Sequence, residues 1–170
     1  MSHEASNVWR GVLLGAAAGL AASWAMEQYQ AAASKAAEAA GQDLGGGDGD
    51  PATVQAADRA VRRVTGEGLA DAQKSSAGEA VHYAFGAFLG AVYGALAEVA
   101  PAVRSGFGSI YGLVVALVAD EGAVPRLRLG PGPSETPAKL QAYALSSHVA
   151  FGVSLEAARR VLSLVFGPGR

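Results

Sequence analysis

Four long stretches without charged residues alternate with polar segments along the chain. They cover residues 11–26, 80–97, 105–119 and 140–155. Each holds about 15 to 18 residues, somewhat fewer than the roughly 20 that a helix needs to cross the hydrocarbon core of a bilayer. Arg10, Arg104 and Arg159 flank three of the stretches, and long basic side chains at helix ends reach back to the membrane surface. The pattern predicts an all-α fold with four short transmembrane helices in a bundle.

Glycines recur at four-residue spacing in the first two stretches and form a single ridge on each predicted helix. The ridge positions are Gly11, Gly15 and Gly19, and then Gly86, Gly90 and Gly94. In a water-soluble helix each interior glycine costs about 1 kcal/mol relative to alanine, whereas in lipid small residues let helix backbones pack closely. We therefore favour a membrane protein over a soluble bundle rich in Gly and Ala. Gly152 in the fourth stretch is assigned to the same packing role.

The polar segment of residues 42–76 contains a flexible glycine-rich break at 45–49 and then a predicted surface helix. This helix should begin near Pro51, because proline suits the first turn, and end at Gly66. Its apolar positions recur at helical spacing with arginines between them, so it is predicted to be amphipathic and to rest at the membrane surface. A proline-rich connection after Ala119 is expected to stay extended until the last helix begins near Ala138.

Composition narrows the classes of function. Hydrophobic residues make up 51% of the chain and charged residues 16%, which favours a membrane environment. The net charge of −2 provides no basic surface for nucleic acid, and the absence of cysteine excludes disulfides and thiolate metal clusters. A cleaved signal peptide is not expected, because residues 31–40 continue the first helix. Ser146 and Ser147 precede His148 but diverge from it on a helix, so we expect no enzyme activity, and no cofactor is predicted.

The second and fourth stretches resemble each other. Residues 82–89 and 148–155 agree at five of eight positions, and each segment begins with histidine, at His82 and His148. The first and third stretches share a weaker pattern, in which an acidic residue follows a Gly-Leu pair. We predict one membrane domain, residues 1–170, made of two helical hairpins, residues 1–100 and 101–170. A unit with an even number of crossings repeats in parallel orientation, so equivalent residues lie on the same side of the membrane.

This arrangement brings ionisable residues together at one end of the bundle. The predicted polar site consists of His82, His148, Glu27, Asp120 and Glu121. Histidine and carboxylate groups suit proton transfer and also bind zinc, manganese or iron, so a proton-responsive site and a metal site both stay open. The third interpretation is structural, with the histidines bonded to neighbouring helices. At the opposite end, Glu156 precedes Arg159 and Arg160 at helical spacing, which predicts ion pairs.

Residues 82–162 resemble the YagU-like family of bacterial inner-membrane proteins, a family of unknown function. The similarity lies in ordered groups of residues: His82-x-x-Phe85, Gly90-x-x-Tyr93-Gly94-x-x-x-Glu98-x-x-Pro101, Ala119-Asp120-Glu121 with Pro125, and Ser147-His148 through Gly152-x-x-x-Glu156-x-x-Arg159-Arg160. The resemblance implies an inner-membrane location, cytoplasmic termini and, through the namesake member of the family, a loose link with acid resistance. It implies no established chemistry.

Two functions follow as expectations. The first is a multi-pass inner-membrane protein, with both termini cytoplasmic, that responds to acid, protons or ions through the histidines and carboxylates. The alternative is a structural or accessory subunit that associates through its glycine rows with a second copy or with another membrane protein. In both cases the lipid bilayer is the main partner.

Overall fold

The computed structural model describes residues 2–44 and 49–166, and this part of the chain forms helices and no strands. The elements are α1 (Ser2–Ala39), α2 (Ala52–Thr65), α3 (Asp71–Val99), a 3₁₀ helix (Pro101–Gly108), α4 (Ser109–Val118), a π-helical segment (Ala119–Ala123), α5 (Val124–Arg126) and α6 (Ala138–Val165). The predicted all-α class is confirmed. Residues 45–48 of the predicted glycine-rich break lie outside the described residues.

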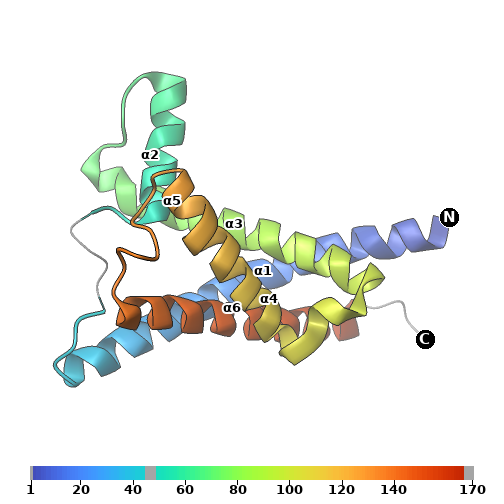
Figure 1. Cartoon of the computed structure of the whole chain (residues 1–170). Helices are drawn as coiled ribbons and strands as arrows, with labels where there is room; N and C mark the ends of the chain where they lie inside the picture. Colours follow the sequence, from blue (N-terminus) through green and yellow to red (C-terminus); the bar gives the residue numbers. More distant parts are fainter. Residues whose placement is uncertain (1, 45–48, 167–170) are drawn as a thin grey trace.

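The long helices α1, α3 and α6 form the body of the molecule (Figure 1). Helix α1 packs against both α3 and α6, and α4 packs against α6. Figure 1 shows α1 running in one direction and α3 and α6 returning in the other, with α4 crossing obliquely. The start of α1 and the end of α6 lie at the same end of the bundle, here called the terminal end. The opposite end, called the loop end, carries α2, α5 and the turn before α6.

The glycine rows of α1 and α3 face each other within the chain. A Cβ atom added at Gly15 would lie 2.1 Å from the Gly90 carbonyl oxygen, and one at Gly19 would lie 2.2 Å from that of Gly86. One at Gly94 would lie 1.9 Å from the carbonyl oxygen of Gly11. Only hydrogen fits at such positions, so the two backbones pack directly on each other.

Helices α4 and α6 also pack through direct backbone contact at glycines, but in a different register. A Cβ atom at Gly152 would lie 2.2 Å from the Gly108 carbonyl oxygen, and one at Gly112 would lie 2.1 Å from that of His148. The sequence comparison equates Gly112 with Gly19 and Gly152 with Gly86. A Cβ atom at Gly19 would meet the Gly86 carbonyl oxygen, yet one at Gly112 would meet that of His148, one turn before Gly152. The two hairpins therefore differ by one helical turn in register.

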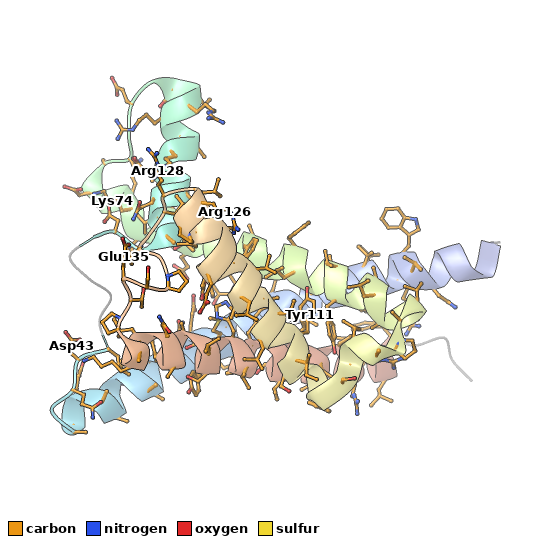
Figure 2. All side chains as sticks on the ribbon, viewed as in Figure 1. Asp43, Lys74, Tyr111, Arg126, Arg128 and Glu135 are labelled. Atoms are coloured by element: carbon orange, nitrogen blue, oxygen red, sulfur yellow. The ribbon has the colours of Figure 1, made fainter. Side chains whose placement is uncertain are left out.

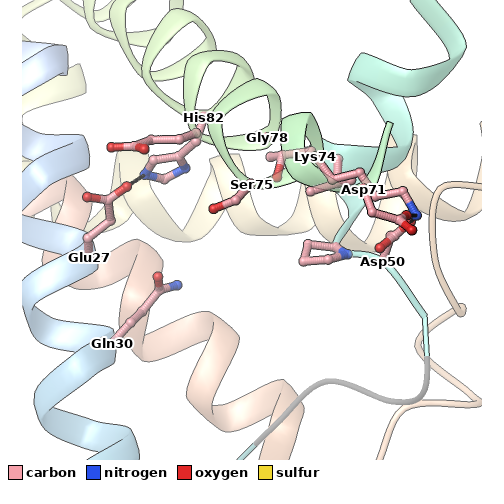
Figure 3. A pocket seen from close by; sticks show the side chains of 12 residues that line it. Glu27, Gln30, Asp50, Asp71, Lys74, Ser75, Gly78 and His82 are labelled. Carbon is pink, nitrogen blue, oxygen red and sulfur yellow. Dashed lines mark ion pairs between the residues drawn. The ribbon is translucent and has the colours of Figure 1, made fainter. Parts of the chain in front are cut away.

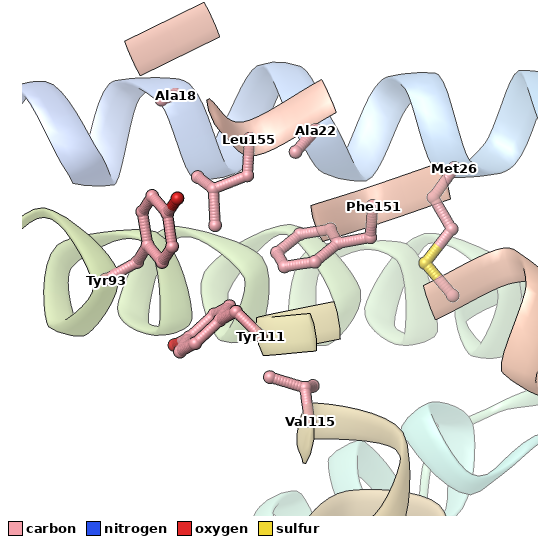
Figure 4. Close-up of a cluster of buried hydrophobic side chains, with 8 residues drawn as sticks. All are labelled: Ala18, Ala22, Met26, Tyr93, Tyr111, Val115, Phe151 and Leu155. Atoms are coloured by element: carbon pink, nitrogen blue, oxygen red, sulfur yellow. The ribbon is translucent and has the colours of Figure 1, made fainter. Parts of the chain in front are cut away.

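The apolar core lies between the four packed helices (Figure 4). Its buried side chains are Ala18, Ala22 and Met26 of α1, Tyr93 of α3, Tyr111 and Val115 of α4, and Phe151 and Leu155 of α6. The tyrosine rings pack with centroids 4.8 Å apart, and the Tyr111 hydroxyl donates a hydrogen bond of 2.8 Å to the Leu89 carbonyl oxygen. A buried tyrosine hydroxyl needs such a partner because it has left water.

In the described part of the chain, three helical segments are long and apolar enough to cross a membrane. They are Asn7–Ala39, Asp71–Val99 and Pro101–Arg126. The sequence predicts four crossings, and the fourth stretch lies in α6, which is not among these three segments. Polar residues at the start of α6 and the charged group Glu156, Arg159 and Arg160 lower its hydropathy. By composition, the structure supports a multi-pass membrane protein with three such helices.

Large apolar side chains on the outer surface of these helices form an apolar belt. Its exposed members are Trp9, Leu13, Leu20 and Trp24 on α1, Phe85, Phe88, Val92, Leu96 and Val99 on α3, and Ile110, Leu113, Val114, Leu117 and Val118 on α4. Charged residues bound the belt on α1 at Arg10 and Glu27, which at 1.5 Å per residue are about 25 Å apart. This thickness is close to that of a hydrocarbon core, and so large an exposed apolar surface fits contact with lipid.

The helices extend well beyond the stretches that predicted them. Helix α1 continues to Ala39, and α3 begins at Asp71. The chain also stays helical through Pro125, where an extended connection is expected, because proline at the first turn of α5 removes no hydrogen bond that the helix needs. The prediction that residues 120–137 are extended is therefore wrong for 120–126. The predicted start near Ala138 is confirmed.

The amphipathic helix predicted after Pro51 is present as α2. Val54 and Ala57 are buried, and a Cβ atom at Gly78 of α3 would lie 2.5 Å from Val54 Cγ2, so α2 packs closely on α3. The helix ends as predicted at Gly66, which has a φ of 81°. Beyond it, the Leu69 N–H donates to Asp58 at 2.7 Å. This bond and the Arg62 guanidinium hold the pKa of Asp58 below its usual value.

A methyl group at Gly90 should destabilise the bundle, because it would lie 2.2 Å from the Gly15 carbonyl oxygen and 2.7 Å from Gly19 Cα. We expect Gly90→Ala to cost about 2 kcal/mol or more and to lower the thermal unfolding temperature in detergent. Gly49→Ala is the matched control, because a Cβ atom there meets nothing within 4 Å. Equal unfolding temperatures for the two variants would contradict the close backbone contact.

Candidate functional site: two histidine–carboxylate pairs

The first pair joins α1 to α3 at the loop end. His82 Nε2 lies 3.8 Å from Glu27 Oε1 and 3.4 Å from the carbonyl oxygen of Ser23. The Tyr83 hydroxyl donates a hydrogen bond of 2.8 Å to the other carboxylate oxygen of Glu27. Both neighbours of Nε2 are acceptors, so this nitrogen is assigned the ring proton of the neutral histidine. In this tautomer the second ring nitrogen, Nδ1, carries no proton.

The second pair joins the end of the α4 segment to α6. His148 Nδ1 lies 3.4 Å from Asp120 Oδ2 and 3.0 Å from the Ala144 carbonyl oxygen. The ring proton is therefore assigned to Nδ1, and Nε2 carries none in this tautomer. Asp120 lies in the π-helical segment Ala119–Ala123, an irregularity that often occurs at functional positions of helices.

The structure separates the residues that the sequence predicts as one polar site. Glu27 pairs with His82 and Asp120 pairs with His148, while Glu121 lies beside Asp120 and lines a small cavity of about 60 Å³ with it. Among the described residues, no three His, Asp or Glu side chains are close enough to hold a metal ion. The described contacts therefore arrange these residues as two pairs, and the role of the site stays a prediction.

A polar cavity of about 610 Å³ opens beside the first pair (Figure 3). Glu27, Gln30 and His82 lie at one end of it, and Lys74 lies at the other end between Asp50 and Asp71. Lys74 Nζ is 3.0 Å from a carboxylate oxygen of each aspartate. The N-terminal end of α2, which lies at the loop end, forms part of the cavity wall. The cavity therefore extends from the loop end to His82 and gives water a route to this side chain.

Two partners of the first pair, and one residue of the cavity beside it, were not identified from the sequence. Ser23 and Tyr83 contact the pair, and Lys74 lines the cavity beside it. Ser23 is fully buried, and its hydroxyl has no hydrogen-bond partner among the described residues. The glycine spacing could have identified Ser23. The facing pairs advance by four residues on each helix, and the last of them is Gly19 with Gly86. One further turn along both helices sets Ser23 opposite His82.

A separate charged group lies nearer the terminal end. Glu156 is fully buried and accepts hydrogen bonds from Arg159 Nε at 2.8 Å, Arg160 Nε at 2.6 Å and the Tyr93 hydroxyl at 2.9 Å. The Arg160 guanidinium also lies 4.5 Å from the centre of the Phe107 ring, a cation–π contact. The structure thus brings together the three residues for which ion pairs are predicted, and it adds Tyr93 from α3.

These features define an all-α protein with helices suited to a membrane and with paired histidine and carboxylate side chains at one end. Residues 67–157, more than half of the 170-residue chain, match the DUF1440 family, described as a protein of unknown function. The chain belongs to this family. The matched region contains His82, Asp120, His148 and Glu156, while Glu27 and the α1 glycines lie before it. No curated protein and no solved structure matches the chain.

Breaking the buried ion pairs from one side should destabilise the protein more than removing both partners. Glu156→Leu leaves the Arg159 guanidinium buried without its carboxylate, which we expect to cost about 3 kcal/mol or more in unfolding free energy. The double variant Glu156→Leu/Arg159→Leu should recover part of this loss. Thermal unfolding in detergent compares the two, and a double variant less stable than the single one would contradict the expectation.

Proposed function

We propose that this protein is a bacterial inner-membrane protein with four crossings that responds to protons through its two histidine–carboxylate pairs. The observation that carries the proposal is the recurrence of the pair: His82 with Glu27 and His148 with Asp120 join different helices at the same end of the bundle. A single pair would be a common structural feature, whereas two in corresponding places favour a shared role.

The packing of α6 supports a fourth crossing. Ser34 of α1 and Tyr143 of α6 lie within hydrogen-bond distance at the loop end, and Leu155 packs between Ala18 and Ala22 in the core (Figure 4). Helix α6 therefore follows α1 through the depth of the apolar belt. Since α1 begins and α6 ends at the same end, an even number of crossings fits the fold. Two of the charged residues that lower the hydropathy of α6, Glu156 and Arg159, are buried inside the bundle and do not face lipid.

The direction of the helices supports two hairpins in parallel orientation. Helices α1 and α3 are antiparallel, as are α4 and α6, and α1 and α4 both run toward the loop end. Each hairpin then has a carboxylate on its first helical segment and a histidine on its second, both where the apolar belt ends toward the loop end. The difference of one turn in register is the main departure from a strict repeat.

The chemistry of the pairs supports a response to acid. Histidine is the side chain that ordinarily titrates nearest neutral pH, and a second proton converts a neutral ring beside a carboxylate into an ion pair. Both pairs lie at the edge of the apolar belt, where screening by water is weaker and a new charge has a larger effect. The implied cytoplasmic termini would direct the loop end, with its polar cavity, to the outside, where acidity varies.

The alternative of an accessory subunit held by glycine rows has less support. The rows on α1 and α3 contact each other inside the chain, so they are not available to a partner. A substitution at Gly90 would then destabilise the protein itself, and any effect on a complex would follow from that loss of stability.

Acid survival of cells that carry histidine variants tests the proposed function. We expect His82→Ala/His148→Ala to abolish the contribution of the protein to survival at low pH, with normal abundance in the membrane fraction. His82→Gln/His148→Gln should do the same, because glutamine keeps a hydrogen-bond donor but takes up no proton. His3→Ala removes the remaining histidine and is the matched control.

A second readout separates loss of response from loss of fold. Trp24 lies on the outer surface of α1, one turn from Glu27, so its fluorescence should change when purified protein in detergent is moved from neutral to acidic pH. The change should persist in His3→Ala and disappear in both double variants. Unchanged survival together with an unchanged fluorescence response in a double variant would refute the proposed function.

A further inference from the structure

Helix α2 lies across the direction of the long helices at the loop end and extends sideways beyond them (Figure 1). It packs on α3 at Gly78, four residues before His82, where the apolar belt ends. Four residues of helix span about 6 Å. The headgroup layer on each face of a bilayer is roughly 5 to 7 Å thick. The position of α2 is therefore that of lipid headgroups, next to the outer edge of the hydrocarbon core.

Arginines gather at this level on two neighbouring elements. The arginine cluster consists of Arg59, Arg62 and Arg63 of α2 together with Arg126 and Arg128 around the end of α5. The Arg59 guanidinium donates hydrogen bonds to the carbonyl oxygens of Leu127 and Arg128 and so attaches this turn to α2. Figure 2 shows Arg126 and Arg128 beside α2.

The guanidinium groups of two members of the cluster have no partner within residues 2–44 and 49–166. Arg62 pairs with Asp58, the acidic residue of α2, at 3.1 Å, whereas the guanidinium groups of Arg63 and Arg128 make no hydrogen bond or ion pair with the described residues. Val64 next to Arg63 is 86% exposed, and neither α3 nor the loop covers it. The far end of α2 thus offers free guanidinium groups beside an uncovered apolar side chain.

We propose that α2 and the turn at Leu127 and Arg128 form a docking surface for anionic phospholipid headgroups. Guanidinium groups bind phosphate oxygens through paired hydrogen bonds, and an amphipathic helix in the headgroup layer places its apolar side chains toward the acyl chains. Arg63 and Arg128 bind the phosphate, and Val64 contacts the acyl region beneath it. This role goes beyond proton response. It rests on the bilayer position proposed above and not on the histidines.

A label at Val64 tests this surface in the full-length protein. The chain has no cysteine, so Val64→Cys accepts a polarity-sensitive fluorophore at one position. The labelled protein is placed in lipid nanodiscs of neutral phosphatidylcholine containing increasing fractions of anionic phosphatidylglycerol. We expect a shift of the emission to shorter wavelength as the anionic fraction rises, because docking moves the label out of water.

Charge variants identify the groups responsible. Each basic residue near an anionic membrane surface contributes about 1 kcal/mol, so Arg63→Gln/Arg128→Gln should weaken docking by about 30-fold. At the anionic fraction that gives half of the shift in the unchanged protein, the variant should show almost none. Lys35→Gln/Lys139→Gln removes the same charge from the loop end outside the cluster, and it should leave the response unchanged.

Other outcomes would overturn the docking surface. These are an identical emission in neutral and anionic nanodiscs, an equal loss in both charge variants, or a shift produced by inorganic phosphate in neutral nanodiscs. The last result would indicate a site for free phosphate. His82→Gln/His148→Gln should keep the lipid response, so failure of the proton response and failure of lipid docking are distinguishable.

Discussion

Direct contact between the backbones of α1 and α3 is the constraint on which the rest of the fold depends. With only hydrogen atoms between them at the glycine positions, the two helices cannot slide or rotate without a clash. This fixed register sets Ser23 opposite His82 and brings the Glu27 carboxylate within reach of the imidazole. It also leaves the large side chains of both helices on the outside or toward α4 and α6, where they form the belt and the core.

The charged group around Glu156 shows how the bundle accommodates polarity inside an apolar environment. Leu155 is in the core, so the neighbouring carboxylate is surrounded by protein and not by water. Two guanidinium groups and a phenol satisfy its oxygens, and the ring of Phe107 supports the outer arginine. Because all of these groups come from α3, α6 and the 3₁₀ segment, the network ties the first hairpin to the second where glycine contacts are absent.

Much of the architecture could be predicted from the sequence, and the failures have physical causes. Uncharged stretches and glycine spacing identified the packed helices, and Gly66 and Ala138 marked boundaries that the structure confirms. The full lengths of α1 and α3 were missed because alanine-rich polar segments favour helix without being apolar. The division of the polar residues into two pairs was missed because hydropathy does not specify register. Asp120 depends in addition on a π-helical turn, for which the sequence offers no local signal.

The two histidines use different ring nitrogens, and this gives the pairs different mechanical properties. His82 reaches across to α1 with Nε2, the atom farthest from its backbone, so its contact depends on the spacing between two separate helices. His148 instead folds back with Nδ1 toward the carbonyl oxygen of Ala144 on its own helix, and Asp120 approaches from outside. A small lateral separation of α1 from α3 would break the first contact and leave the second intact. The first contact is therefore sensitive to the distance between α1 and α3, and the second is sensitive to the conformation of the π-helical turn.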